Sequence, residues 1–205
     1  MVSVFLKGFA AGGSLIAAIG AQNAFILSQG IKKNRIVLIP LICCICDLIF
    51  ITLGIYWSSK IVSTSVILEK TIALCGCCFL FFYGLNSFIS AFKNKKIDME
   101  FEKEKSIKKI ILATLGVTLL NPHFYLDTVF LLGSISSSVG SSGKIFFGTG
   151  AVTASIIWFF GLSLFASFLS PVFKNEKSWK ILDVSVGIIM WSIAFSLFFS
   201  TFLKT

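Results

Sequence analysis

Long runs of hydrophobic residues divide the chain into six segments, and each is separated from the next by a shorter polar stretch. Crossing a bilayer takes roughly 20 predominantly apolar residues, and all six runs are long enough. Their apolar positions are continuous rather than alternating, which favours helices over the strands of a β-barrel. The pattern predicts an all-α integral membrane protein whose six transmembrane helices lie near residues 3–27, 36–58, 66–91, 109–135, 144–169 and 179–203.

The fourth segment carries a polar interruption, in the stretch IILATLGVTLLNPHFYLDTVFLL at residues 110–132. Asn121 followed by Pro122 predicts the end of one helix and the start of another. Pro is disfavoured inside a helix but suits its first turn, and Asn is a good N-cap. Asp127 lies four residues after His123, so both are expected on one helical face. A break and a titratable pair inside a membrane segment are typical of a transport site.

A weak internal repeat relates the first segment to the fourth. Residues 20–27 read GAQNAFIL. Placing Gln22 over Asn121 also superposes two pairs of identical residues, the Phe pair 25 and 124 and the Leu pair 27 and 126. Three helices in each repeat require opposite insertion directions, so we expect two inverted repeats with the first and fourth helices broken. Glycines in the first segment also predict close helix packing, at Gly8, Gly12, Gly13 and Gly20. One transmembrane domain is expected, with repeat 1 at about 1–91, a cytoplasmic loop at 92–108 and repeat 2 at about 109–205.

Composition and charge agree with this reading. Hydrophobic residues make up 56% of the chain and the mean hydropathy is +0.94, which leaves no room for a soluble domain. The net charge of +9 does not indicate nucleic-acid binding, because 13 of the 18 Lys and Arg residues lie in the loops after segments 1, 3 and 5. By the positive-inside rule these loops are cytoplasmic and both termini lie outside.

The central acidic residues of the segments have no Lys or Arg beside them in the middle of any segment. Asp47 and Asp127 lie centrally, and His123 is the single candidate for an internal cation. A carboxylate at the bilayer centre costs several kcal/mol unless it is paired, protonated or solvated. The missing positive charge is therefore expected from a ligand, a proton or a metal ion. Asp183 lies nearer an interface, and we expect an ion pair with Lys180, three residues earlier.

The broken helices predict groups that complement these acids. A helix that starts at Asn121 and Pro122 is expected to present free N–H groups and a positive dipole end to a carboxylate. Gln22 and Asn23 add amide groups from the other repeat. The combination fits a zwitterion with an extra positive charge, such as a basic amino acid, although a polyamine or a metal cation would also fit.

Proton coupling is a second expectation for the same residues. His123, Asp127 and Asp47 are candidates to carry protons, since His titrates near neutrality and desolvation in a membrane can bring an Asp into the same range. Alternatively, His123 only hydrogen-bonds Asp127 or an exposed carbonyl. Expelling one positive charge against an inside-negative potential costs about 2.3 kcal/mol per 100 mV. Counter-movement of a proton cancels that charge, so antiport is the natural hypothesis for an exporter.

Other classes of function find less support. Thiolates bind soft metals, but Cys is also a small hydrophobe and no conventional metal-ligand spacing occurs, so no metal or cofactor is predicted. One His without a catalytic partner motif argues against an intramembrane enzyme. A non-transporting scaffold would leave the buried acids unexplained. The cysteines form two clusters, Cys43, Cys44 and Cys46, then Cys75, Cys77 and Cys78.

At these residues the chain resembles the LysE-type family of bacterial lysine and arginine exporters, over nearly its whole length. The resemblance is carried most specifically by GAQNAFILSQG at 20–30, by Cys43 and Asp47 followed by Leu53-Gly54, and by LNPHFYLDTVFLLGS at 120–134.

The resemblance implies export of basic L-amino acids across the bacterial inner membrane, six helices in inverted repeats, and homodimers. The wider superfamily exports neutral amino acids or cations, including heavy metals, but the NPHFYLD stretch favours the basic amino-acid branch. It does not choose between lysine and arginine. The functional positions that it implies are Gln22, Asn23, Asp47, Asn121, Pro122 and Asp127.

Overall fold

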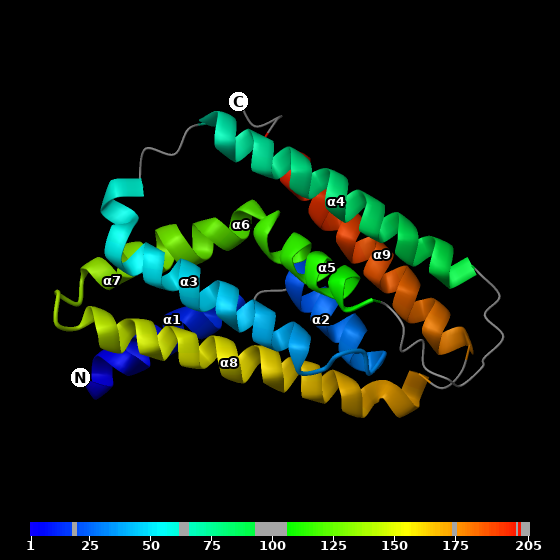
Figure 1. Cartoon of the computed structure of the whole chain (residues 1–205), viewed down its shortest axis with the longest axis horizontal. Coiled ribbons are helices and arrows are strands. Elements are labelled where there is room, and N and C mark those ends of the chain that lie inside the picture. The colour runs from blue at the N-terminus through cyan, green and yellow to red at the C-terminus, as the bar shows by residue number, and fades with distance from the viewer. Residues whose placement is uncertain (18–19, 62–65, 93–105, 174–175, 200, 202–205) are drawn as a thin grey trace.

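The computed structural model describes residues 1–17, 20–61, 66–92, 106–173, 176–199 and 201. All regular secondary structure in these ranges is helical (Figure 1), including one π-helix, η1, and one 3-10 helix, η2. The elements are α1 (Val2–Ile16), α2 (Ala21–Ile31), α3 (Leu38–Ile61), α4 (Val66–Phe92), α5 (Ile107–Leu119), α6 (Pro122–Tyr125), η1 (Leu126–Leu131), α7 (Leu132–Ser137), α8 (Lys144–Leu169), η2 (Ser170–Phe173) and α9 (Glu176–Phe198).

The described residues contain four helices that could each cross a membrane and two bent helix pairs, and together these correspond to the six predicted segments. The helices α3, α4, α8 and α9 are each long and apolar enough to cross a membrane. The first span consists of α1 and α2, which meet at 79°, and the fourth consists of α5 and the segment from Pro122 to Ser137, which meet at 65°. The expected breaks in the first and fourth spans are therefore confirmed.

Helices of one half of the chain pack on helices of the other half. The helix α1 lies along α8, α3 packs on the segment from α5 to α7, and α4 lies along α9 (Figure 1). In the order of the spans, the first pairs with the fifth, the second with the fourth and the third with the sixth. This pairing is the one expected of two three-helix repeats related by a two-fold axis.

Small residues bring α1 and α8 into backbone contact. A Cβ atom on Gly8 would meet the carbonyl of Phe147, and one on Gly12 would lie 2.9 Å from the Cα atom of Ala151. From the other side, a Cβ atom on Gly150 would meet the backbone of α1. Side chains at these positions would force the helices apart, so the predicted small-residue packing is confirmed at Gly8 and Gly12.

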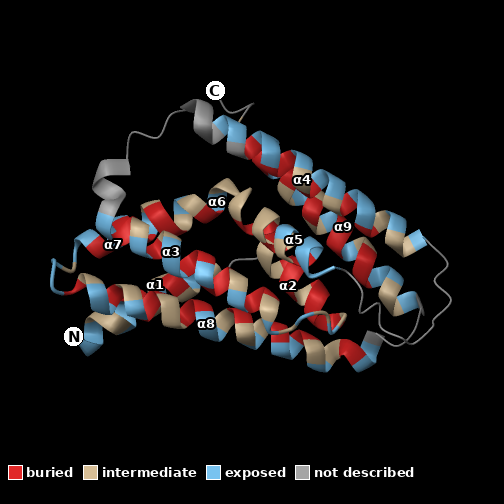
Figure 2. Ribbon diagram, in the orientation of Figure 1, coloured by how far each residue is buried: buried red, intermediate tan, exposed pale blue. Residues whose placement is uncertain are grey.

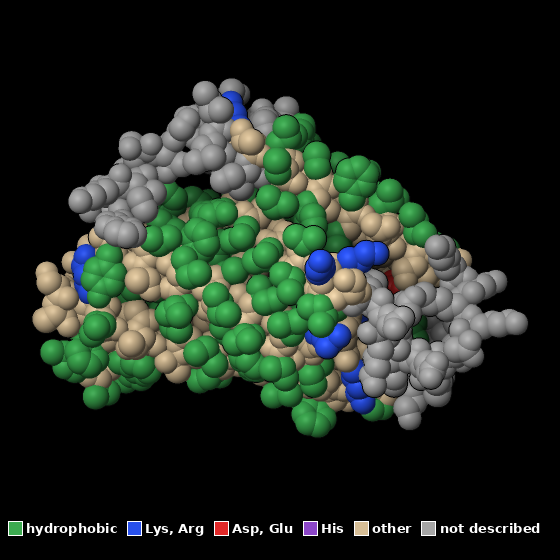
Figure 3. Space-filling model, in the orientation of Figure 1, with side chains coloured by type: hydrophobic (Ala, Val, Ile, Leu, Met, Phe, Trp, Pro, Cys, Tyr) green, Lys and Arg blue, Asp and Glu red, His purple; other side chains and the backbone are tan. Residues whose placement is uncertain are grey.

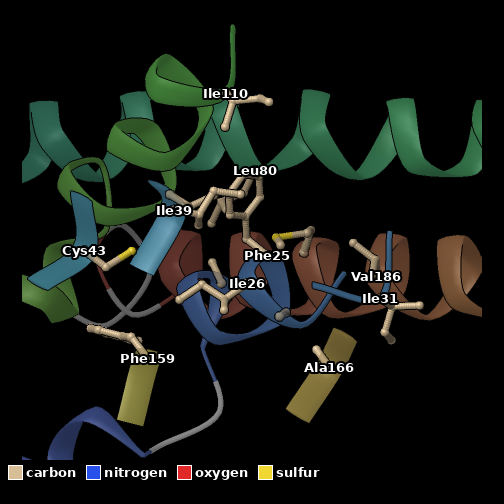
Figure 4. Close-up of a cluster of buried hydrophobic side chains, with 14 of the residues drawn as sticks. Phe25, Ile26, Ile31, Ile39, Cys43, Leu80, Ile110, Phe159, Ala166 and Val186 are labelled. Atoms are coloured by element: carbon tan, nitrogen blue, oxygen red, sulfur yellow. The ribbon is translucent and has the colours of Figure 1, made fainter. Parts of the chain in front are cut away.

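The helix α2 lies at the centre of the molecule and is buried along most of its length (Figure 2). Its side chains pack with residues of five other helices in one hydrophobic cluster (Figure 4), which we call the central cluster. This cluster runs from Phe159, at mid-height in α8, to Ile31 at the end of α2. Its members also include Phe25, Ile26, Ile39, Leu80, Ile110, Leu182 and Val186.

The molecular surface is apolar around its middle, as a membrane-spanning protein requires. Large hydrophobic side chains such as Phe82, Leu112 and Phe165 are exposed, and hydrophobic side chains cover most of the described face in Figure 3, where Lys and Arg lie at the left edge, at the top and in the right half. The ends of α2, α4 and α8 and the starts of α5 and α9 meet at one side (right in Figure 1). We call this side the Lys-rich end; its described basic residues are Lys32, Lys33, Arg35, Lys108, Lys109, Lys177 and Lys180. Most of the predicted 92–108 loop lies outside the described residues.

Candidate functional site

Both helix breaks face one cavity of about 330 Å³. Its walls come from the junction of α1 and α2, from α3, from α6 and η1, and from α8 and α9. Of the seven residues predicted for the site, Pro122 is not part of the lining; it is the first residue of α6, where it fixes the helix start. The other six line the cavity together: Gln22, Asn23, Asp47, Asn121, His123 and Asp127.

The N–H groups of His123 and Phe124, at the start of α6, donate hydrogen bonds within the protein. Pro122 has no N–H, and the N–H of His123 donates to Oδ1 of Asn121 at 3.1 Å. The N–H of Phe124 donates to the carbonyl of Asn121 at 3.0 Å. The prediction that this helix start offers free donors to a carboxylate is therefore wrong, because the side chain of Asn121 caps the helix that it begins.

The start of α2 has no such cap. Its N-cap is Gly20, which has extended backbone and no side chain to accept from the first turn. A Cβ atom at Gly20 would have no atom within 4 Å, so the helix start faces open space in the cavity. Within the described residues, Nε2 of Gln22 is buried and has no hydrogen-bond partner. The backbone N–H groups of Ala21 and Gln22 and the side-chain amide of Gln22 are therefore the donors on this side of the cavity.

Two polar side chains hold the helix breaks in shape. Nδ2 of Asn23 donates to the carbonyl of Ile16 at 2.9 Å, and Oδ1 accepts from Nε1 of Trp158 at 3.2 Å. In the second break, the hydroxyl of Tyr125 donates to the carbonyl of Leu119 at 2.7 Å. Both satisfy carbonyls at the end of the preceding helix. These bonds hold Asn23 at the first break, and its role as a ligand stays a prediction. The matching bond of Tyr125 was not predicted.

The predicted alignment of the first and fourth segments differs from an alignment on the two helix starts. The N-caps of these helices are Gly20 and Asn121. Superposing them places Gln22 over His123, two residues away from the predicted match with Asn121. The identical residues in the sequence suggested an alignment that the caps do not follow.

The acid on α3 is deeply buried. Asp47 is 1% exposed, and its Oδ2 accepts a hydrogen bond from the hydroxyl of Ser155 on α8 at 2.6 Å. Ser155 was not predicted for the site, although a small polar residue in the middle of an apolar segment is a signal of this kind of partner. The hydrogen bond fixes the orientation of the carboxylate in the cavity wall.

The second acid, Asp127, is part of the π-helix η1 and is only partly buried. This helix packs directly on α3 at Gly54, where a Cβ atom would lie 2.5 Å from the carbonyl oxygen of Thr128 and 2.7 Å from Cα of Val129. Only glycine allows this approach, so Gly54 helps set where Asp127 lies. His123 and Asp127 both line the cavity. The π-helix from Leu126 to Leu131, which contains Asp127, was not predicted.

The cavity is therefore acidic. Its lining, all of it in described residues, contains two Asp side chains, one His and no Lys or Arg. All six cysteines are free. In the described ranges, no group of three or more His, Cys, Asp or Glu side chains could hold a metal ion.

The third intramembrane acid forms an ion pair, but not with the predicted partner. Oδ1 of Asp183 lies 2.7 Å from Nζ of Lys32, at the end of α2. Lys180 instead lies over the ring of Phe92, 4.6 Å from its centroid. The proximity of Lys180 in sequence was misleading, because the packing of α2 against α9 brings Lys32 to the carboxylate.

The chain is similar in sequence to a family of translocators and to proteins named as exporters. The family described as "LysE type translocator" matches residues 13–201. Arginine exporter protein ArgO of Salmonella enteritidis is 38% identical over 201 residues, which cover 96% of this chain and 94% of that protein. The proteins of the same name from Salmonella newport and Salmonella typhimurium are 37% identical over the same shares. No solved structure matches the chain.

Proposed function

Since the chain belongs to the LysE type translocator family, we propose that it exports basic L-amino acids, arginine or lysine, from the cytoplasm. The acidic cavity at the two helix breaks is the observation that carries this proposal. Asp47 and Asp127 line it without a Lys or Arg, so a cationic ligand supplies the missing charge. The named function of the relatives, arginine export, puts arginine ahead of lysine.

The two sides of the cavity suggest how the amino acid lies. Its cationic side chain faces Asp47 and Asp127, and its carboxylate faces the uncapped start of α2 and the amide of Gln22. Helix starts attract carboxylates through N–H groups and the helix dipole. The cavity volume of about 330 Å³ lies at the low end of small-molecule pockets, about 300 to 1,000 Å³, which favours one amino acid over a peptide.

Proton antiport completes the proposed mechanism. The cavity contains three groups able to bind protons, Asp47, Asp127 and His123. A proton that enters as the cation leaves cancels the charge moved, which removes a cost of about 2.3 kcal/mol per 100 mV. In this scheme Asp127 and Asp47 hold either the substrate cation or a proton, and His123 passes protons to Asp127.

Orientation and assembly are part of the same proposal. The Lys-rich end lies in the cytoplasm and both termini lie outside, as the positive-inside rule predicts. The protein acts in the bacterial inner membrane as a homodimer, which the family resemblance implies. Cross-linking in native membranes tests the dimer, and labelling of a tag at each terminus in intact cells tests the orientation.

Counterflow in proteoliposomes tests the substrate and the coupling together. The purified protein is given labelled arginine, lysine, threonine or leucine, with and without a pH gradient. We expect exchange of arginine or lysine and a rate that changes with the pH gradient. Failure on both basic amino acids would refute the proposal, and a rate indifferent to pH would refute only antiport. Removal of all six cysteines should leave export intact, since a metal exporter that used thiolates would lose activity.

A further inference from the structure

Asp183 lies outside the cavity, at the Lys-rich end, and its side chain is buried, with 9% of its surface exposed. Each of its oxygens has a partner from a different helix. Oδ1 accepts from Nζ of Lys32, the C-cap of α2, at 2.7 Å, and Oδ2 accepts from the hydroxyl of Ser90 on α4 at 2.8 Å. Asp183 therefore joins α9 to both α2 and α4.

The Lys32 ammonium lies beside one carboxylate and one aromatic ring. The ammonium touches the carboxylate of Asp183 and lies 6.0 Å from the centroid of the Trp179 ring. A carboxylate beside an aromatic face recognises alkylammonium and guanidinium groups. The side chain of Lys32 is 27% exposed, so its ammonium can move into water while the carboxylate stays buried.

The Asp183 carboxylate lies at the Lys-rich end, and the central cluster separates it from the cavity. The central cluster fills the space from Phe159, which lines the cavity, to Ile31 beside Lys32. The helices α4 and α9 pack mainly on each other, and polar contacts tie them to α2: Lys32 to Asp183, and Nε2 of Gln29 to the hydroxyl of Tyr83 at 3.4 Å. Separation of α2 from α9 would open one route from the Lys-rich end towards the cavity, and it would break the Lys32–Asp183 pair.

We infer that Asp183 is an entrance site for the cationic side chain of the exported amino acid, and that Lys32 occupies it as an internal competitor while this end is closed. The inference rests on the proposed function. The entering cation takes the place of the ammonium on Asp183, and Lys32 keeps its charge in water. A ligand that must displace a bound group has an apparent affinity equal to its intrinsic affinity multiplied by the fraction of time that the site is free.

Opposite effects of two substitutions test this role. Uptake of labelled arginine into inverted membrane vesicles, with the rate normalised to the amount of transporter, gives the half-saturation concentration at the Lys-rich end. Lys32→Met removes the competitor and should lower that concentration by about tenfold if the site is nine-tenths occupied. Asp183→Asn removes the acceptor and should raise it by about tenfold, since a charge-assisted contact is lost. A purely structural ion pair would shift both variants in the same direction.

A second variant keeps the test decisive if Lys32→Met does not fold. Lys32→Arg preserves the ion pair, but its guanidinium binds carboxylates through two N–H groups and competes more strongly, so the half-saturation concentration should rise at least about threefold. Lys180→Met, which removes a cation of the same end that contacts Phe92 rather than Asp183, should behave as the wild type. Unchanged half-saturation in Lys32→Arg, or shifts of one sign in Lys32→Met and Asp183→Asn, would overturn the inference. If the wild type transports neither basic amino acid, the proposed function fails instead.

Discussion

The two acids of the cavity show what single residues contribute and how far the sequence reveals it. Asp47 and Asp127 were predicted for the site because carboxylates are costly in apolar segments, and both line the cavity. The roles of Asn23 and Asn121 could not be predicted in the same way. Their amides bond to backbone groups of the breaks, and these partners depend on the path of the chain through each break. Polar residues in an apolar segment thus predict a site but not the bonds within it.

Loss of the charge on Asp127 should affect transport far more than folding. Asp127→Asn keeps the size of a partly buried side chain but removes its charge and its proton-binding group. We expect arginine counterflow per purified transporter to fall at least about tenfold, equivalent to about 1.4 kcal/mol, with nearly normal membrane expression. The neighbouring, exposed Leu126→Met should change neither. Normal transport by Asp127→Asn would remove this residue from the site.

The hydrogen bond from Ser155 to Asp47 should also be required. Ser155→Ala removes a bond to a carboxylate, a loss of about 1.5 to 3 kcal/mol for a charged acceptor, and should lower the transport rate about tenfold or more. Ser163→Ala is the matched control, since Ser163 is a buried serine on the same helix whose hydroxyl donates to the carbonyl of Ile36. Equal transport rates of the two variants, measured on equal amounts of folded protein, would mean that the bond to Asp47 has no special role.

Among the elements, η1 deviates most from what the sequence predicts. The Asn-Pro pair predicts a break because Pro and Asn act locally on the helix start, and the structure confirms this break. The π-helix from Leu126 to Leu131 has no comparable local signal. It lies where the backbone of Thr128 and Val129 contacts Gly54 on α3, and such a contact between distant residues is invisible in a single sequence.

A methyl group at Gly54 should disturb Asp127 without touching it. Gly54→Ala places Cβ 2.5 Å from the carbonyl of Thr128, so η1 must move, at a cost of about 1 to 3 kcal/mol for overpacking. We expect a lower melting temperature and weaker arginine transport. Gly161→Ala, at a helical glycine with no neighbour within 4 Å, should leave transport unchanged and be neutral or slightly stabilising. If Gly54→Ala behaved like this control, the contact would not position Asp127.

At the scale of the molecule, the number of spans and their breaks could be predicted from the sequence, because hydrophobic length and helix-breaking residues set them locally. The central position of α2 and the pairing of Lys32 with Asp183 could not, since both follow from how six spans pack together. In a membrane protein, the lipid-facing and protein-facing sides of a helix are both apolar. The hydrophobic pattern therefore predicts where the spans lie but not which helix packs on which.

The pairing of spans across the two halves has a consequence for how the chain is made. Every span of the first half packs mainly on a span that the ribosome has yet to synthesise, so the first half has no complete set of partners of its own. Cleaving the gene between the codons for residues 92 and 106 should give two fragments that are each degraded when expressed alone. Their co-expression should restore stable protein and arginine export by fragment complementation. Assembly of this transporter is then a late event, completed only when the last helix enters the membrane.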